Sequence, residues 1–233
     1  MTNTPAAELS AAELAQMIDH TLLKQDSSRE DILRVCKEAR EYKFKSVCVN
    51  PIWASTVTKA LEGSGVLTTS VIGFPFGATP TAVKVFETKQ AIADGANEID
   101  MVIDIASANR GDREALLADI SAIAGAAHEG GAILKVIIET AMLSQEAKVL
   151  ACQASVEAKA DFVKTSTGFG GGGATVEDVA LMRKTVGPDM GVKASGGVRT
   201  REDALNLIEA GATRLGASSG IAIVSGELGE SSY

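Results

Sequence analysis

Three lysines recur at one fixed interval in this sequence. Lys135, Lys164 and Lys193 are each 29 residues apart, in the β-type stretches ILKVIIE, FVKTST and GVKAS. In each stretch the lysine alternates with apolar residues, so we expect it on the polar face of a strand. Lysine is rarely buried without a partner, because removing its charge from water costs several kcal/mol or shifts its pKa until it is neutral. The equal interval therefore indicates three lysines at similar positions of neighbouring strands.

A lysine beside a second cation can become a nucleophile. A free lysine has a pKa of about 10.4 and is protonated at neutral pH. Two ammonium groups about 6 Å apart repel by roughly 2.8 kcal/mol at an effective dielectric constant near 20, which lowers a pKa by about two units. Partial burial lowers it further. A neutral amine forms a Schiff base with a carbonyl compound, and the protonated iminium makes an adjacent carbanion accessible as an enamine.

The position of Lys164 favours it as the Schiff-base residue. It is the central lysine, and its strand opens into the glycine-rich stretch 168–173. We predict that Lys193 is the neighbouring cation that depresses the pKa of Lys164. Asp100, on the polar face of the stretch EIDMVID, is the candidate general acid and base, since an aspartate, a lysine and a water can together move the protons of imine chemistry.

Purely structural ion pairing is the alternative for these side chains. Lys135 lies deeper in its strand than the other two lysines, and we predict that it pairs with Asp100, Asp104 or Glu139. Asp100 could equally be a plain salt-bridge partner of a lysine, and this role is compatible with proton transfer.

These residues belong to a series of eight β-type stretches that alternate with helical ones. The stretches are 17–23, 46–49, 66–74, 98–104, 133–140, 162–167, 191–197 and 214–218. Eight β/α units in about 250 residues are typical of a (β/α)8 (TIM) barrel. A doubly wound sheet is the alternative, but 233 residues with no further domain favour closure. We predict one α/β domain over 1–233, with an N-terminal helix over 1–16 and a mobile C-terminal tail over 227–233.

Alternation within the strands places polar side chains inside this barrel. The stretches around Asp100, Lys135, Lys164 and Lys193 each carry apolar residues on one face and polar residues on the other. A purely structural barrel fills its interior with branched apolar side chains. Polarity on four consecutive strands therefore indicates a functional site.

Helix start signals support the predicted order of elements. Ser27 and Glu30 form a capping-box pattern, and Thr79 is a candidate N-cap before Pro80 at the first helical position. Further N-caps are predicted at positions that precede an acidic first turn, namely Ser144, Thr175 and Thr200.

Composition narrows the classes of partner. The chain is 45% hydrophobic and 22% charged, with a net charge of −8, which disfavours nucleic acid and anionic membranes as partners. No apolar run approaches the ~18 residues of a membrane span, and 1–16 lack the features of a signal peptide. We expect a cytoplasmic protein.

The cysteines and histidines indicate neither a disulfide framework nor a metal site. Cys36, Cys48 and Cys152 are odd in number and lack CxxC spacing, as in a protein of the reducing cytoplasm. His20 and His128 lack metal-ligand spacing, so a structural role is expected for each, although His20 lies in a polar strand-like stretch that leaves other roles open.

Two glycine-rich loops are candidates for phosphate binding. The stretches SGGVRT (195–200) and GASSG (216–220) follow strands seven and eight, where barrels often bind phosphate. Either loop alone is as well explained by turn glycines and N-cap serines. The stretch 168–173 matches G-x-G-x-x-G, but it follows the sixth strand and the next strand ends without an acidic residue, so we do not predict a dinucleotide site.

The motifs DHTLLK, CVNP, EIDMVID, LKVIIET, FVKTSTGF, VKASGGVRT, LGASSG and a terminal SSY resemble the deoxyribose-phosphate aldolase family of class I aldolases. The resemblance covers nearly the whole chain in order. It implies a (β/α)8 barrel that reversibly cleaves 2-deoxy-D-ribose 5-phosphate into D-glyceraldehyde 3-phosphate and acetaldehyde, with no metal or organic cofactor.

The resemblance also assigns roles to individual residues. It makes Lys164 the Schiff-base lysine, Lys193 the second catalytic lysine, Asp100 the catalytic aspartate and Lys135 a third active-site lysine. Supporting positions near the site or in a proton relay are Asp19, Cys48 and Tyr233, the last on a mobile tail. The implied phosphate-binding residues are Gly168, Gly196, Gly197, Gly216, Ser218 and Ser219.

One departure from the family pattern concerns the phosphate site. Some members carry a basic residue directly after the TSTG glycine, where this chain has Phe169. This difference bears on phosphate affinity and substrate breadth.

Two other functions stay open on the residues alone. Another Schiff-base aldolase or a transaldolase would use the same lysine chemistry with a different donor. A non-catalytic barrel that binds a sugar phosphate would keep the phosphate loops but not the lysine pair, and both lysines are present. The expected partners are a phosphorylated sugar and acetaldehyde, and we expect a homo-oligomer, namely a dimer.

Overall fold

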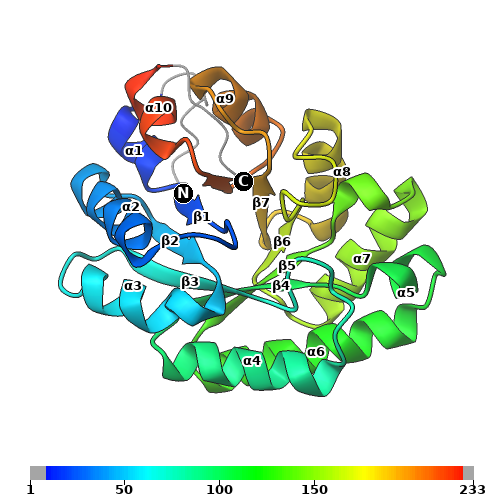
Figure 1. Ribbon diagram of the computed structural model, residues 1–233. Helices are drawn as coiled ribbons and strands as arrows, with labels where there is room; N and C mark the ends of the chain where they lie inside the picture. The colour runs from blue at the N-terminus through cyan, green and yellow to red at the C-terminus, as the bar shows by residue number, and fades with distance from the viewer. Residues whose placement is uncertain (1–8, 228–233) are drawn as a thin grey trace.

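Eight parallel strands close into a barrel in the order of the sequence (Figure 1), which confirms the predicted (β/α)8 architecture. The structure is a computed structural model that describes residues 9–227. The strands are β1 (Ile18–Leu22), β2 (Ser46–Val49), β3 (Leu67–Ile72), β4 (Glu98–Val102), β5 (Ile133–Ile137), β6 (Phe162–Lys164), β7 (Gly191–Ser195) and β8 (Arg214–Ala217). β1 pairs with β8, so the sheet has no free edge.

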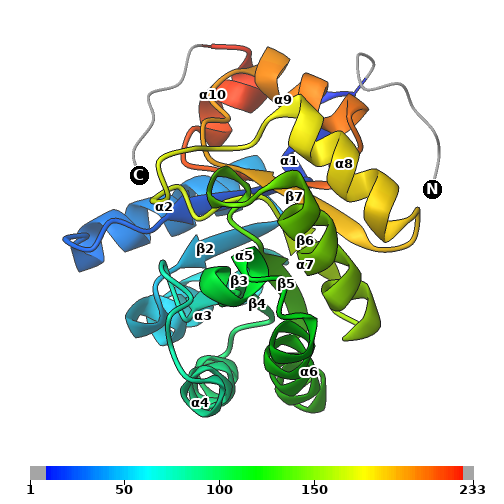
Figure 2. The same ribbon diagram turned by 90° about the vertical axis from the view of Figure 1, so that its right-hand side faces the viewer.

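Helices surround the strands, as both views show (Figures 1 and 2). They are α1 (Ala11–Ala15), α2 (Arg29–Tyr42), α3 (Ala54–Leu61), α4 (Thr81–Ala93), α5 (Ile105–Asn109), α6 (Arg113–Glu129), α7 (Gln145–Glu157), α8 (Val176–Val186), α9 (Arg201–Glu209) and α10 (Gly220–Ser225), with short 3-10 turns η2 (Pro51–Trp53) and η3 (Thr140–Met142). None of the helices in this part of the chain is long and apolar enough to cross a membrane.

Most helix starts follow the predicted caps, and two differ by one residue. Ser144, Thr175 and Thr200 each accept a backbone N–H through the side chain, as predicted. The capping box of α2 is formed by Ser28 and Asp31, so the predicted pair Ser27 and Glu30 is wrong by one position.

The start of α4 also differs from the prediction. Pro80 has an extended backbone (φ −55°, ψ 142°) and is itself the N-cap, so Thr79 does not cap this helix.

The chain termini are only partly described. Within residues 9–227 the predicted N-terminal helix begins at Ala11, because Ser10 and Glu13 form a capping box that sets its first turn. Residues 228–233, which include Tyr233 and most of the predicted tail, lie outside the described residues.

The strands divide their side chains between two environments. Outward-facing apolar residues such as Ile99, Val136, Val163 and Val192 are completely buried against the surrounding helices. The alternate residues point into the barrel, and on β4 to β7 they include charged side chains that are also buried. This inward set forms the candidate site.

Candidate active site

Seven charged side chains form one buried network inside the barrel. They come from β1, β4, β5, β6, β7 and β8, and each reaches the interior because side chains alternate along its strand. The members are Asp19, Glu98, Asp100, Lys135, Lys164, Lys193 and Arg214. The structure thus brings together five of the residues predicted from the sequence with two, Glu98 and Arg214, to which no role was assigned.

Asp100 lies at the centre of this network. Its Oδ1 accepts a hydrogen bond from Lys135 Nζ at 2.8 Å. Its Oδ2 accepts from both Lys164 Nζ and Lys193 Nζ, each at 2.8 Å. Because one oxygen serves both lysines, their nitrogens lie no further apart than twice that distance, which agrees with the spacing expected for neighbouring strands.

A second group of contacts lies toward the N-terminal ends of the strands. Lys135 Nζ is 2.6 Å from Glu98 Oε2, and Lys193 Nζ is 2.5 Å from Asp19 Oδ2. Arg214 Nη1 joins these carboxylates, at 2.7 Å from Asp19 Oδ1 and 2.9 Å from Glu98 Oε2. Every charged group in this layer therefore has an oppositely charged partner, which is the condition for keeping it out of water.

The three predicted partners of Lys135 have different roles. Asp100 pairs with Lys135, as expected. Asp104 instead caps α5, accepting from Ala106 N at 3.1 Å. Glu139 accepts hydrogen bonds from the backbone and hydroxyl of Thr167. The predicted ion pair of Lys135 is therefore confirmed with Asp100 as its partner, while Asp104 and Glu139 have other contacts at the C-terminal ends of the strands.

The network holds one more basic group than acidic groups. Three lysines and Arg214 face Asp19, Glu98 and Asp100. Lys193 contacts two of these carboxylates, whereas Lys164 contacts only Asp100 in the described part of the chain. Loss of one proton from Lys164 would balance the charges. The arrangement therefore favours Lys164 as the amine that becomes neutral.

The pKa directions agree with this distribution of charge. Burial lowers the pKa of Lys164, Lys193 lowers it further, and Asp100 opposes both. Burial also acts against the charge of Lys193, but Asp100 and Asp19 outweigh it and raise the pKa of that residue. From the sequence, repulsion by Lys193 was expected to be the main cause of the lowered pKa of Lys164. In the structure burial is the largest cause, and Asp100, which accepts from both ammonium groups, opposes the lowering.

Both aspartates of the network are ionised. Burial by itself would raise the pKa of Asp100, but Lys135, Lys164 and Lys193 together hold it well below its ordinary value. The pKa of Asp19 is likewise lowered by its cationic neighbours Lys193 and Arg214. An ionised Asp100 that accepts hydrogen bonds from both Lys164 and Lys193 can accept and return protons at these amines.

Cys48 lies beside the network in an apolar setting. It is completely buried on β2 and packs with Leu23, Val71 and Phe74. Burial raises the pKa of its thiol, so the sulfur is protonated at neutral pH. Its position is close to that expected, but its chemistry is that of a core side chain.

The predicted phosphate loops adopt backbone conformations that require glycine. Gly168, Gly196 and Gly197 have φ values of +90°, +84° and +78°. Ala174 N donates to the carbonyl oxygens of Ser195 and Gly196, each at 3.0 Å. The loop after β6 therefore lies directly against the loop after β7, backbone to backbone.

Gly216 has a second role that the sequence did not reveal. It lies within β8 and not in the following loop. A Cβ atom at this position would be 3.1 Å from Lys193 Cε and 2.9 Å from Ser195 Cβ. Gly216 thus makes room for the stem of Lys193. Of the two serines predicted with it, Ser218 follows the strand and Ser219 is the N-cap of α10.

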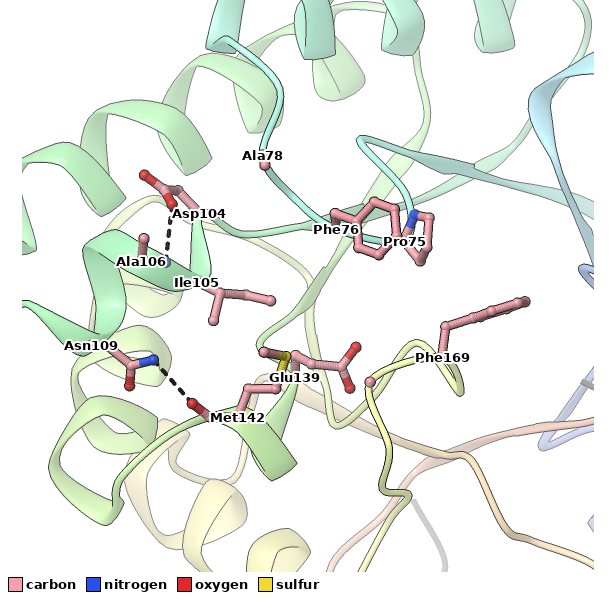
Figure 3. Close-up of a pocket in the computed structure, with 11 residues that line it drawn as sticks. Pro75, Phe76, Ala78, Asp104, Ile105, Ala106, Asn109, Glu139, Met142 and Phe169 are labelled. Atoms are coloured by element: carbon pink, nitrogen blue, oxygen red, sulfur yellow. Dashed lines mark hydrogen bonds between the residues drawn. The ribbon is translucent and has the colours of Figure 1, made fainter.

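A cavity of about 620 Å³ lies over the loops that follow β3, β4, β5 and β6 (Figure 3). Phe76, Ile105, Met142 and Phe169 contribute apolar surface, and the carboxyl group of Glu139 points toward the Phe169 loop. The described residues that line it include no basic side chain. Phe169, which lines this cavity, also meets the ring of Phe74 edge-on, with the ring centroids 5.5 Å apart.

Comparison with known protein families gives one match that covers most of the chain. Residues 13–226 match the family described as DeoC/LacD family aldolase. An enzyme of Micrococcus luteus named deoxyribose-phosphate aldolase is 61% identical over 222 residues, which cover 93% of this chain and 97% of the relative. Its namesake from Lysinibacillus sphaericus is 56% identical over 219 residues, covering 94% of this chain and 98% of the relative.

Solved structures show the same similarity. The tetrameric deoxyribose phosphate aldolase of Aeropyrum pernix superposes with a TM-score of 0.87 at 35% identity, covering 93% of this chain and 91% of that one. An aldolase called QR15 superposes with a TM-score of 0.86 at 37% identity, covering 91% of this chain and 95% of that one.

Proposed function

This chain belongs to the DeoC/LacD family of aldolases, and from that membership we propose that it reversibly cleaves 2-deoxy-D-ribose 5-phosphate into D-glyceraldehyde 3-phosphate and acetaldehyde. It is an enzyme, a carbon–carbon lyase, that acts on a small phosphorylated sugar. The observation that carries the mechanism is the buried Lys164, whose pKa is lowered while that of the adjacent Lys193 is raised.

The reaction begins with a covalent step at Lys164. Its neutral Nζ attacks the C1 aldehyde of the open-chain sugar, and loss of water from the carbinolamine leaves a protonated iminium. Asp100 Oδ2 accepts hydrogen bonds from both Lys164 Nζ and Lys193 Nζ. Asp100 and Lys193 therefore supply and receive the protons of these steps.

Cleavage uses the iminium as an electron sink. A base takes the proton of the C3 hydroxyl, the C2–C3 bond breaks, and its electron pair forms an enamine on the lysine while C3 becomes the aldehyde of glyceraldehyde 3-phosphate. Protonation of the enamine at C2 and addition of water release acetaldehyde and restore the amine. Asp100, acting through a water, is the proposed base, since its lysine partners hold it ionised.

The remaining predicted residues support these steps. Lys135 and Asp19 set the charge around Asp100 and Lys193. The backbone at Gly168, Gly196, Gly197 and Gly216, with Ser218 and Ser219, is the proposed phosphate site, supported by the left-handed glycines and the contact between two of the loops. A contribution from Cys48 and Tyr233 stays a prediction of the family resemblance.

The test is a direct assay with purified protein. Incubation with 2-deoxyribose 5-phosphate should produce acetaldehyde and glyceraldehyde 3-phosphate in equal amounts, and the Lys164→Met variant should produce neither. A transaldolase would instead transfer a three-carbon unit from fructose 6-phosphate to an acceptor aldehyde. Binding of the sugar phosphate without any product would indicate a non-catalytic barrel.

We also infer that the enzyme forms a homodimer in the cytoplasm. Val83 and Phe86 expose 45% and 69% of their surface on one face of α4, which a second copy could cover. The three cysteines are unpaired, as expected in a reducing compartment. Light scattering on the purified protein tests the dimer, and a monomeric mass would contradict it.

A further inference from the structure

Glu139 combines a left-handed backbone conformation with a buried carboxyl group. It follows β5 directly and lies in the left-handed region (φ 56°, ψ 66°), which few residues other than glycine adopt. The residue is only 1% exposed. Within residues 9–227 it makes no ion pair, and burial raises the pKa of its carboxyl group. A buried acid in strained backbone persists where the surrounding structure needs it.

The contacts of Glu139 all lead to the loop after β6. Its Oε2 accepts the backbone N–H of Thr167 at 3.2 Å and the Thr167 hydroxyl. The same hydroxyl oxygen accepts the N–H of Phe169 at 3.0 Å. The loop then passes over the carboxyl group so closely that a Cβ on Gly170 would be 2.7 Å from Glu139 Cδ. One carboxyl group thus determines the path of the first half of the loop.

This loop joins the two parts of the proposed site. At its start, Thr167 is three residues beyond Lys164. At its end, a Cβ on Gly173 would be 2.2 Å from the carbonyl oxygen of Gly196, so the loop is packed backbone to backbone on the second proposed phosphate loop. Glu139 fixes the near end, and the contact with Gly196 fixes the far end.

We propose that Glu139 is a positioning residue, which acts through Thr167 to hold the loop of residues 168–173 in the conformation that receives the phosphate group of the substrate. The inference rests on the proposed aldolase function. Hydrogen bonding, not charge, is the operative property, because the carboxyl group accepts from two neutral donors. A side chain that accepts the same hydrogen bonds without a charge should therefore replace it.

Kinetic measurements with two substrates distinguish this positioning role from a general structural role. With 2-deoxyribose 5-phosphate, the Glu139→Ala variant should show a KM raised about tenfold or more, since a buried donor loses its acceptor and the loop its anchor. With unphosphorylated 2-deoxyribose, kcat/KM should stay within about threefold of that of the unsubstituted enzyme, because no phosphate is bound. Glu139→Gln should restore the KM for the phosphorylated sugar.

A second variant, Gly170→Ala, disturbs the contact between Glu139 and the loop by a change in the loop itself. Gly170→Ala places a methyl group against the carboxyl of Glu139 without backbone strain, since this glycine is not among those with positive φ. It should raise the KM for the phosphorylated sugar in the same way. The combination of Glu139→Ala with Gly170→Ala should be less than additive, because both remove the same anchor.

The outcomes distinguish the inference from the function on which it rests. An unsubstituted enzyme that fails to cleave 2-deoxyribose 5-phosphate overturns both. An active enzyme whose Glu139→Ala variant keeps its KM, or loses activity equally on both sugars, overturns the positioning role alone. So does a Glu139→Gln variant as impaired as Glu139→Ala. Thermal unfolding of each variant identifies losses caused by misfolding. If Glu139→Ala misfolds, the KM values of Glu139→Gln and Gly170→Ala test the positioning role instead.

Discussion

Lys164 and Lys193 are paired residues of adjacent strands, and their side-chain nitrogens share a single acceptor oxygen. Although both are buried in the same interior, their pKa values move in opposite directions, down for Lys164 and up for Lys193. The difference follows from the carboxylates: Lys193 also contacts Asp19, whereas Lys164 depends on the shared oxygen of Asp100. In the proposed mechanism, Lys164 is therefore the nucleophile and Lys193 stays protonated.

Removing the charge of Lys193 should move the pH dependence of catalysis. Lys193→Met eliminates a like charge near Lys164 and leaves Asp100 less neutralised, and both changes raise the pKa of Lys164. The acid limb of the kcat/KM profile should therefore shift to higher pH, by about one to two units. Lys193→Arg, which keeps the charge, is the control. A profile for Lys193→Met that coincides with that of the unsubstituted enzyme would refute the coupling of the two lysines.

Trapping the intermediate should identify the nucleophile. Borohydride reduction in the presence of acetaldehyde should add an ethyl group to the peptide that contains Lys164, as mass mapping can show. Lys164→Met should abolish the adduct and reduce turnover by about 10³-fold or more. An adduct found mainly at Lys193 or Lys135 would reverse the assignment.

A methyl group added at Gly216 of β8 should disturb catalysis by displacing Lys193. Gly216→Ala would place a Cβ 3.1 Å from Lys193 Cε, so the lysine must move and kcat should fall about 10²-fold, the scale of a small misplacement. The matched control is Gly125→Ala on α6, where a Cβ meets nothing within 4 Å. This change should keep full activity and stabilise the helix by about 0.5–1 kcal/mol. Equal activities of the two variants would contradict the packing role of Gly216.

The buried network should make stability depend on Asp19. Asp19→Asn leaves Lys193 and Arg214 short of a carboxylate, which we expect to cost roughly 3–5 kcal/mol of unfolding free energy at pH 7. The pKa of Asp19 is lowered in the folded state, so its contribution is complete above the unfolded value of about 3.9 and is lost as the pH falls below it.

Urea unfolding between pH 7 and pH 3 measures this difference. The difference in unfolding free energy between the unsubstituted protein and Asp19→Asn should become smaller below about pH 4. Glu157→Gln removes one member of an exposed ion pair with Arg113 and should change stability by less than about 1 kcal/mol. A constant gap across the whole pH range would show that the carboxylate charge of Asp19 is not what stabilises the fold.

Chelation of metals should leave turnover unchanged. The iminium on Lys164 supplies the electron sink that a metal ion supplies in metal-dependent aldolases, so the proposed mechanism has no step for a metal. Activity with 2-deoxyribose 5-phosphate should be the same before and after dialysis against EDTA. Loss of activity that added zinc restores would contradict the Schiff-base mechanism.

Much of the barrel follows from local patterns. Eight β-type stretches predicted the eight strands, and alternation within them placed Asp100, Lys135, Lys164 and Lys193 in the interior, because neighbouring side chains of a strand point to opposite faces. The N-caps Ser28 and Pro80 were predicted one residue too early. At α2 two adjacent serines fit the cap pattern, and at α4 Pro80 keeps an extended backbone and so precedes the first helical residue.

The sequence by itself determined which side chains of each strand point into the barrel, because the alternation of side chains is a local property. The equal interval predicted the pairing of Lys164 with Lys193, but Lys135 is paired with Phe162 and not with Lys164. Only the tertiary structure decided how many carboxylates each lysine meets. Closure of the barrel brings Arg214 of β8 onto Asp19 of β1, 195 residues away, and sets Asp19 against Lys193 but out of contact with Lys164. Electrostatic interactions depend on distance in space, so the opposite pKa shifts of two similar lysines are set by the closed fold.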